Sequence, residues 1–214
     1  MVQRFYEKTS RDHIWNADET GVRANRSGGV KVLAARGARS YYRIVPNNTE
    51  HMTVLVAINA VGGRIPGFYI FKGERRMQNW IADCEVGAAF AISKKAWMTD
   101  NLWPQWLEHF VKLVLGGCLP TNHHALIVDG HRSHVTKVAL DTARMLGVDV
   151  ILLPAHTSHH MQPLDIACFG PYKRYFRQCV DEHTLGHLGH EVNCQDLAQL
   201  SSRAMAMALT PTNI

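Results

Sequence analysis

The sequence lacks paired cysteines, a long apolar run, internal repeats and low-complexity segments. Its five cysteines are odd in number and form no CxxC pair, which argues against a disulfide framework and for a reduced, intracellular protein. The first residues, MVQRFYEKTSRDHIW, have no apolar core of a signal peptide. The longest apolar stretch, around TVLVAINAV, is too short to span a membrane. We therefore expect no membrane partner.

The composition is that of an ordinary globular protein with an excess of basic over acidic residues. The chain has 214 residues, 46% of them hydrophobic and 19% charged, enough for one or two domains with a sizeable core. The formal net charge of +5 and the pI of about 9.0 favour a polyanionic partner such as nucleic acid. The thirteen histidines are either metal ligands or simply a bias of the composition.

Residues 13–73 carry the signals of three β-strands. The stretch HIWNADETGV, residues 13–22, has the apolar-to-acidic character of a strand that ends in a turn. Farther along, MTVLVAINAVGGRIPGFYIFKG contains two β-rich runs separated by Gly-Gly, which predicts a hairpin. We expect these strands to be antiparallel, and we expect residues 74–102 to be less regular.

Downstream, helical patterns alternate with buried strands. WPQWLEHFVKLVLGG and SHVTKVALDTARMLG predict two helices, the second with Ser133 as N-cap and Gly147 as C-cap. HALIVDGH and VDVILLP have the continuous apolar runs of strands buried on both faces. Two more helices are expected, one from LDIACFGPYKRYFRQCVDEHT with an interruption at Gly170-Pro171, and one near 195–209.

This order of elements predicts the fold class. A strand, a helix and a strand at this spacing form a unit with parallel strands. We therefore expect an α/β domain with a mixed five-stranded sheet flanked by helices. Strands 1–3 would form its antiparallel hairpin side, and strands 1, 4 and 5 would be parallel.

Three aspartates lie at the ends of these elements. Asp18 ends the first strand, Asp129 ends the first parallel strand, and Asp165 starts a helix. If the first and fourth strands are neighbours, a helix packed across their ends brings all three carboxylates together. Converging carboxylates raise one another's pKa, and a pair of Mg²⁺ ions removes that repulsion. Two such ions about 4 Å apart can clamp the attacking and leaving oxygens of a phosphodiester.

Spacing alone does not separate this metal site from ordinary capping or turn-forming aspartates. Three longer blocks are more specific: IWNADETGV, LIVDGHRSHVT and LLPAHTSHHMQPLDIACFGPYKRYF. They resemble the signature blocks of the pogo, Tigger and jerky group of DDE transposases, which includes centromere protein B. The resemblance runs from about Ile14 to Tyr175. It implies a ribonuclease H-like fold, with Asp18, Asp129 and Asp165 as the catalytic triad and the ligands of two Mg²⁺ or Mn²⁺ ions.

The resemblance also implies a domain organisation and a function. Residues 1–13 would end an upstream linker, 14–183 would be the DDE catalytic domain, and 184–214 a truncated C-terminal helical extension. We expect no counterpart of the family's N-terminal helix-turn-helix region within this chain. The implied function is a polynucleotidyl transferase or DNA endonuclease, with DNA as partner, homo-oligomeric assembly and a nuclear location. The alternative is a domesticated, non-catalytic DNA- or chromatin-binding protein, or an inactive transposon fragment, on the same fold.

Several neighbours of the triad are accessory candidates. Glu19 could add a ligand, although adjacent side chains on a strand point to opposite faces. His131 and His134 flank Asp129 and would either contact phosphate and orient a ligand, or serve as ordinary turn and helix-start residues. Gln162 would either touch DNA or brace its loop.

Basic side chains suggest where DNA would bind. Lys173, Arg174 and Arg177 follow Asp165 on the same predicted helix. Together with Arg132 they are the predicted phosphate contacts, which supply salt-dependent affinity independent of base sequence. Four tryptophans fit a core better than base-stacking platforms: Trp80, Trp97, Trp103 and Trp106.

Two groups of histidines are zinc candidates. The first lies in a polar loop that we expect to line the cleft instead, and consists of His156, His159 and His160. The second falls at helical spacing near two cysteines, and consists of His183, His187 and His190 with Cys179 and Cys194. Gly186 and Gly189 weaken the helix on which that spacing depends. A zinc-binding interaction module is therefore a third hypothesis.

Overall fold

The computed structural model describes residues 9–24, 35–37, 50–75, 78–114, 116–118, 122–155, 157–188 and 190–214. The first eight residues of the expected linker lie outside this set. Everything below concerns the described residues.

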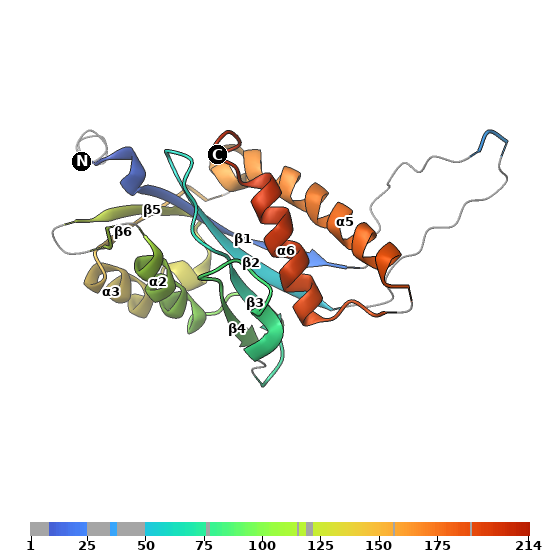
Figure 1. The fold of residues 1–214 in the computed structure, drawn as a ribbon. Helices are drawn as coiled ribbons and strands as arrows, with labels where there is room; N and C mark the ends of the chain where they lie inside the picture. The colour runs from blue at the N-terminus through green and yellow to red at the C-terminus, as the bar shows by residue number, and fades with distance from the viewer. Residues whose placement is uncertain are drawn as a thin grey trace.

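A mixed sheet forms the centre of the molecule (Figure 1). Its six strands lie in the order β4-β3-β2-β1-β5-β6. Their bounds are Ile14–Arg23 for β1, His51–Asn59 for β2, Phe68–Lys72 for β3, Ala89–Ser93 for β4, His124–Val128 for β5 and Val148–Leu152 for β6. β1, β2 and β3 pair antiparallel, whereas β1, β5 and β6 pair parallel. The predicted α/β class, hairpin and parallel strands are confirmed.

The expected number of five strands is wrong because β4 adds a sixth. β4 pairs in parallel with β3 at the edge of the sheet, within the stretch that we expected to be less regular. Its sequence, AFAIS, contains only Phe90 and Ile92 as strong strand formers. Pairing with β3, rather than local preference, therefore decides that this segment is a strand.

Helices cover both faces of the sheet (Figure 1). α2, Leu102–Leu113, and α3, Lys137–Met145, pack on one face, whereas α5, Phe169–Gly186, and α6, Cys194–Ala208, pack on the other. The remaining helical segments are short: η1 at Arg11–His13, η2 at Gln78–Ile81, η3 at Arg132–His134, α4 at Ser158–Met161 and η4 at Leu164–Cys168. Strand side chains alternate between the faces, so Ala17 of β1 joins the core under α2 and Val22 joins the core under α5 and α6. β1 is thus buried between two hydrophobic cores.

The ends of α3 differ from one expectation and confirm another. Ser133 is not the N-cap; Thr136 is, because its hydroxyl accepts the Ala139 backbone N–H at 3.1 Å. Gly147 follows the helix with a φ of 72°, the left-handed conformation that glycine adopts readily.

The predicted interruption at Gly170-Pro171 is wrong. α5 runs through both residues, and Pro171 lies in its first turn, where a missing N–H removes no hydrogen bond within the helix. The irregular turn comes earlier, as the π-helical segment η4 that carries Asp165. Such single π turns are frequent at functional sites.

The C-terminal residues share the core of the sheet. α5 continues across the expected domain boundary at 183/184, and α6 buries Leu197, Leu200 and Met205 against the same cluster as β2 and β3. The end of α5 and α6 therefore pack as part of this fold.

Candidate active site

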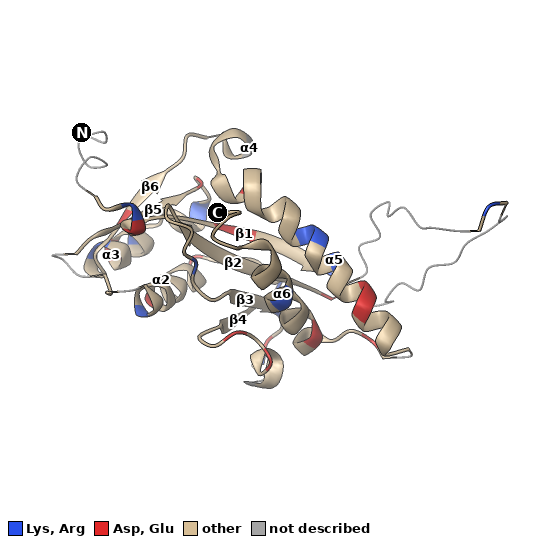
Figure 2. Cartoon of the chain, turned by 45° about the horizontal axis from the view of Figure 1, so that its top comes forward, with Lys and Arg blue, Asp and Glu red and all other residues tan. Residues whose placement is uncertain are grey.

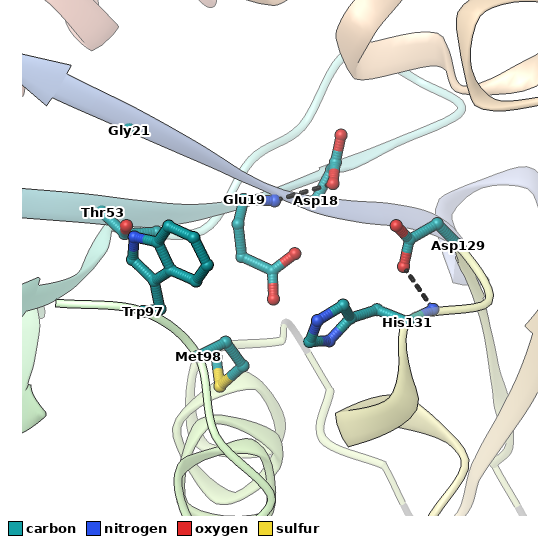
Figure 3. A pocket seen from close by; sticks show the side chains of 8 residues that line it. All are labelled: Asp18, Glu19, Gly21, Thr53, Trp97, Met98, Asp129 and His131. Carbon is teal, nitrogen blue, oxygen red and sulfur yellow. Dashed lines mark hydrogen bonds between the residues drawn. The ribbon is translucent and has the colours of Figure 1, made fainter. Parts of the chain in front are cut away.

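Asp18 and Glu19 lie on opposite faces of β1, near its middle. Figure 3 shows the two side chains diverging from the strand, with Glu19 on the side of Trp97 and Met98. Asp18 points toward the face covered by α5, as its alternation with Ala17 requires. Both carboxylates nevertheless line one pocket, because Asp18 lies beside the point where β1 passes the end of β5.

The Asp18 carboxyl lies in an unfavourable environment for an anion. Asp18 is only 9% exposed to solvent. Burial, together with the negative charges of Glu19 and Asp165, raises the pKa of Asp18 to about 7. The Glu19 backbone N–H donates to Asp18 Oδ1 at 2.8 Å, which opposes the increase without cancelling it. Asp18 is thus a carboxyl that a nearby cation would readily ionise.

Asp129 follows β5 and is held by its own loop. Its Oδ1 accepts the His131 backbone N–H at 3.0 Å and lies 3.0 Å from Nδ1 of His134. These hydrogen bonds, first that of His134, lower the pKa of Asp129. Both contacts use Oδ1, so Oδ2 has no hydrogen bond among the described residues, and Asp129 lines the pocket.

His134 joins Asp129 to Glu19. Its ring is 1% exposed, and its Nε2 lies 3.3 Å from Glu19 Oε1. Burial alone would lower the pKa of His134, but the hydrogen bonds to Asp129 and Glu19 prevail and raise it to about 10. The ring is therefore a buried cation at neutral pH. His134 thus lies between two carboxylates of the pocket and contacts both of them.

Hydrogen bonds of Asn16 and Gln162 fix the position of the segment that leads to Asp165. Asn16 donates to the Ile127 carbonyl at 3.0 Å and to Gln162 Oε1 at 2.8 Å, and its own Oδ1 accepts the Leu164 N–H at 3.2 Å. Gln162 also donates to the Ala17 carbonyl at 3.2 Å. Both amides are buried, so Gln162 braces its loop.

Asn16 was missed by the sequence analysis. The signal was available, because a polar residue between Trp15 and Ala17 on a buried strand must find partners.

The pocket beside these carboxylates has a volume of about 310 Å³. Figure 3 shows the pocket and its lining: Asp18, Glu19, Gly21, Thr53, Trp97, Met98, Asp129 and His131. Trp97 is 64% exposed, so the expectation that it belongs to the core is wrong, whereas Trp103 and Trp106 are fully buried as predicted. An exposed aromatic side chain beside the carboxylates is available to a ligand.

The structure brings the three aspartates of the predicted triad to one region. The charge of Asp165, exposed on η4, acts on Asp18, and Asp129 shares the pocket with Asp18. Among the described residues, their oxygens do not all lie within 4.8 Å of one another. Ligands of two ions about 3.5–4 Å apart need not meet that limit, since they are spread over both ions.

The predicted DNA contacts lie outside the pocket. Arg132 is exposed and lies 3.9 Å from Asp100. Lys173, Arg174 and Arg177 lie on the first half of α5, where Figure 2 shows basic segments. Arg174 and Arg177 are exposed.

The candidate zinc loop is only partly described. His156 lies outside the described residues, as does the side chain of His159.

A family model matches most of the chain. The model of the DDE superfamily endonuclease family covers residues 49–208, which include Asp129 and Asp165 and exclude Asp18. The chain belongs to the DDE superfamily endonuclease family. The resemblance inferred from the three sequence blocks is thereby confirmed at the level of the family.

Curated relatives of this DDE family chain are much longer. An "MFS-type transporter clz9" of Cochliobolus lunatus is 30% identical over 207 residues, 95% of this chain and 22% of that protein. The human "Pogo transposable element with KRAB domain" is 25% identical over 166 residues, 73% of this chain and 25% of that protein. The chain thus spans about a quarter of the length of the relatives it matches. Among the described residues, no helix has the length and apolarity needed to cross a membrane.

Solved transposase structures share the fold. A Mos1 transposase paired-end complex with the left transposon end matches with a TM-score of 0.55 and 13% identity, over 97% of this chain and 55% of that one. A Mos1 mariner paired-end complex with Mn matches with a TM-score of 0.53 and 14% identity, over 96% and 56%. This likeness confirms the ribonuclease H-like fold of the DDE family chain.

Proposed function

We propose that the chain is the catalytic part of a pogo-like DDE transposase, which cleaves or joins DNA phosphodiesters with two Mg²⁺ or Mn²⁺ ions. The observation that carries the proposal is the placement of Asp18 and Asp129 on one pocket, with η4, which carries Asp165, in contact with β1. The environment of Asp18 supports the same proposal. The pKa of Asp18 is raised to about 7 by burial and by two further carboxylates, Glu19 and Asp165. Family membership and the fold support the same reaction class.

The residues present fit a hard divalent cation. Asp18, Asp129 and Asp165 offer oxygen atoms, which are the donors that Mg²⁺ and Mn²⁺ prefer. Asp129 Oδ2 and the exposed Asp165 carboxylate are accessible, and Asp18 would ionise beside a positive charge. When bound, such ions polarise the phosphodiester and generate the nucleophile at neutral pH. Solved Mos1 mariner complexes with Mn and with Mg are consistent with this metal class.

The other polar residues of the site would position these carboxylates. His134 holds Asp129 and Glu19 at a fixed separation, because its ring contacts both at 3.0 and 3.3 Å. Asn16 and Gln162 tie β1 and β5 to the turn that leads to Asp165. Glu19 stays a proposed accessory ligand, and His131, on the pocket wall, a proposed contact of phosphate.

DNA would be held by the basic side chains of α5 and by Arg132. Lys173, Arg174 and Arg177 lie on the helix that directly follows Asp165, so a phosphodiester at the aspartates would pass near them. The solved Mos1 complexes contain transposon-end DNA, which supports DNA as the partner. A nuclear location and homo-oligomeric assembly are part of the same proposal.

The test is nicking of supercoiled DNA by the purified full chain with Mn²⁺. We expect Asp18→Asn, Asp129→Asn and Asp165→Asn each to lower the rate at least about 100-fold, since even outer partners of metal ligands contribute about 10–100-fold. Asp141→Asn is the matched control, because Asp141 is a surface carboxylate of α3 paired with Arg144.

Nicking that survives Asp129→Asn would refute the catalytic assignment. Absence of nicking, with DNA binding that is equal in the wild type and Asp129→Asn, would identify instead a non-catalytic DNA-binding protein on this fold.

A further inference from the structure

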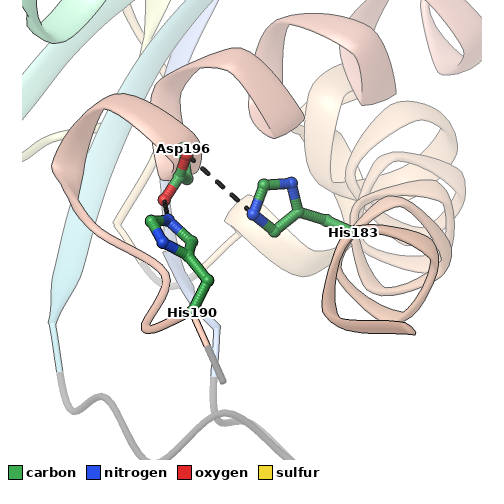
Figure 4. Close-up of side chains that lie close together, drawn as sticks. All are labelled: His183, His190 and Asp196. Carbon is green, nitrogen blue, oxygen red and sulfur yellow. Dashed lines mark hydrogen bonds and ion pairs between the residues drawn. The ribbon is translucent and has the colours of Figure 1, made fainter. Parts of the chain in front are cut away.

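A second cluster of metal-ligating side chains lies far along the chain from the aspartates, where α5 ends and α6 begins. His183 belongs to the last turn of α5, His190 to the connection, and Asp196 to the first turn of α6. Figure 4 shows the two imidazole rings directed at the Asp196 carboxylate. His190 Nε2 lies 2.9 Å from Asp196 Oδ2, and His183 Nε2 lies 3.9 Å from Asp196 Oδ1. Among the described residues, this is the one group of three whose ligand atoms all lie within 4.8 Å of one another.

His183 has an unsatisfied nitrogen at this position. Its Nε2 is buried and has no hydrogen-bond partner, and its side chain is only 12% exposed. A buried polar atom without a partner costs free energy, so such atoms are uncommon in native proteins. The unpartnered nitrogen points toward the Asp196 carboxylate (Figure 4), where a cation would satisfy it.

We propose that His183 Nε2, His190 Nε2 and Asp196 bind one Zn²⁺ ion, with a fourth position open to solvent. Ligand atoms about 2.0–2.1 Å from a tetrahedral zinc lie about 3.3 Å apart. The separations of 2.9 Å to Asp196 Oδ2 and 3.9 Å to Asp196 Oδ1 fall on either side of that value, and all three ligand atoms lie within 4.8 Å of one another. Imidazole nitrogen favours zinc over Mg²⁺ or Ca²⁺, which take oxygen ligands.

The carboxylate is already oriented for this role. Asp196 Oδ2 accepts the Asn193 backbone N–H at 2.9 Å, as part of a capping box at the start of α6. Hydrogen-bonded carboxylates are typical of zinc sites, because the second contact fixes the direction of the ligand.

This ligand set differs from the one that helical spacing suggests. His187 stacks on His183 with ring centroids 4.4 Å apart, and its Nδ1 contacts the His183 carbonyl at 2.9 Å. Cys194 Sγ donates to Glu50, and Cys179 lies on the buried face of α5, in the hydrophobic core. The zinc ion would connect the end of α5 to the start of α6 and so hold together the helical pair that covers one face of the sheet. This site is independent of the proposed DNA chemistry.

The test is a zinc titration of the full chain after chelation, in competition with a chromophoric chelator. All samples carry Asp18→Asn, so that zinc at the aspartates does not enter the stoichiometry. We expect one equivalent of zinc and a rise in melting temperature on binding. His190→Gln and Asp196→Asn should each raise the Kd at least about 10-fold. His187→Gln is the matched control and should change the Kd less than about 2-fold, because its ring stacks without contributing a ligand. His190 is 47% exposed, so its variant should fold even if Asp196→Asn impairs the cap.

Co²⁺ binding gives a second readout. We expect an absorption spectrum of a nitrogen- and oxygen-ligated ion without a thiolate charge-transfer band. A thiolate band would assign Cys179 or Cys194 and overturn the proposal. Equal zinc affinity in the parent and in His190→Gln would also overturn it, as would loss of binding in His187→Gln.

Discussion

The two carboxylates side by side on β1 lie in opposite electrostatic environments. Glu19 contacts the buried ring of His134, which is positively charged at neutral pH and also pairs with Asp129. Asp18, on the other face, is influenced chiefly by burial and by other carboxylates. The protein thus supplies a cation of its own on one side of the site, where His134 offsets part of the charge of Glu19 and Asp129, and its described residues supply none to Asp18 on the other side. Carboxyl groups with a pKa perturbed in this way cluster at functional sites.

The largest change in stability should follow from removing the charged ring of His134. We expect His134→Ala to lower the free energy of unfolding at pH 7 by about 3–5 kcal/mol, as removal of one partner from a buried ion pair does. Because the pKa of His134 is raised from 6.5 to about 10, its contribution is complete below pH 6.5 and disappears as pH rises through 10. Urea unfolding between pH 6 and 10 measures this.

In the same experiment, His131→Ala should cost less than about 0.5 kcal/mol, because that side chain is exposed. If His134→Ala unfolds with an unchanged pH slope above 6.5, the ring is not a buried cation and the comparison fails.

For Asp18 we expect the opposite effect: replacing its carboxyl group should stabilise the protein. The pKa of Asp18 rises from 3.8 unfolded to about 7 folded, so the native state loses stability as pH increases through this window. Three units correspond to about 4 kcal/mol, so Asp18→Asn should stabilise the metal-free protein by up to that amount at pH 8 and have little effect at pH 4. Thermal melts in a chelator at both pH values check this. Destabilisation of the same size at both pH values would contradict it.

A smaller loss of stability should result from breaking the hydrogen bonds that tie β1 to the turn before Asp165. Gln162→Ala removes the partner of the buried Asn16 amide and of the Ala17 carbonyl, which should cost about 1–3 kcal/mol. Met161→Ala, on an exposed neighbour, is the control and should cost less than about 0.5 kcal/mol. Chemical denaturation at pH 6 measures both variants. Equal costs would show that Gln162 does not brace the site.

The smallest effect that we expect is on DNA binding, from substitutions in α5, the helix that follows Asp165. Each of Arg174→Gln and Arg177→Gln should weaken DNA binding and reduce the magnitude of the slope of log K against log salt by about 1. Arg144→Gln, an exposed position on α3 across the sheet, should leave the slope unchanged. Fluorescence anisotropy at several salt concentrations distinguishes the two outcomes. Equal slopes in all three variants would remove α5 from the proposed DNA surface.

Much of the fold could be predicted from local patterns. The hairpin of β2 and β3 follows from two apolar runs around Gly-Gly, and the parallel strands β5 and β6 follow from continuous apolar runs on either side of a helix. β4 could not be predicted, since AFAIS has weak local preference and becomes a strand only by pairing with β3. The exposure of Trp97 could not be predicted either, because a tryptophan after a short loop has no periodicity that indicates its environment.

The sequence by itself determined which chemical groups are available: two aspartates in β-strand patterns and one at a helix start, the three blocks typical of the DDE family, and histidines close together near the C-terminus. Tertiary structure alone decided how those groups are paired. The alternation of β1 separates Asp18 from Glu19, and the packing of η3 buries His134 between Glu19 and Asp129. The return of α6 along α5 selects His183, His190 and Asp196 instead of the helical set containing His187. Spacing along a chain fixes a side chain's direction within one element, whereas charge compensation depends on contacts between elements.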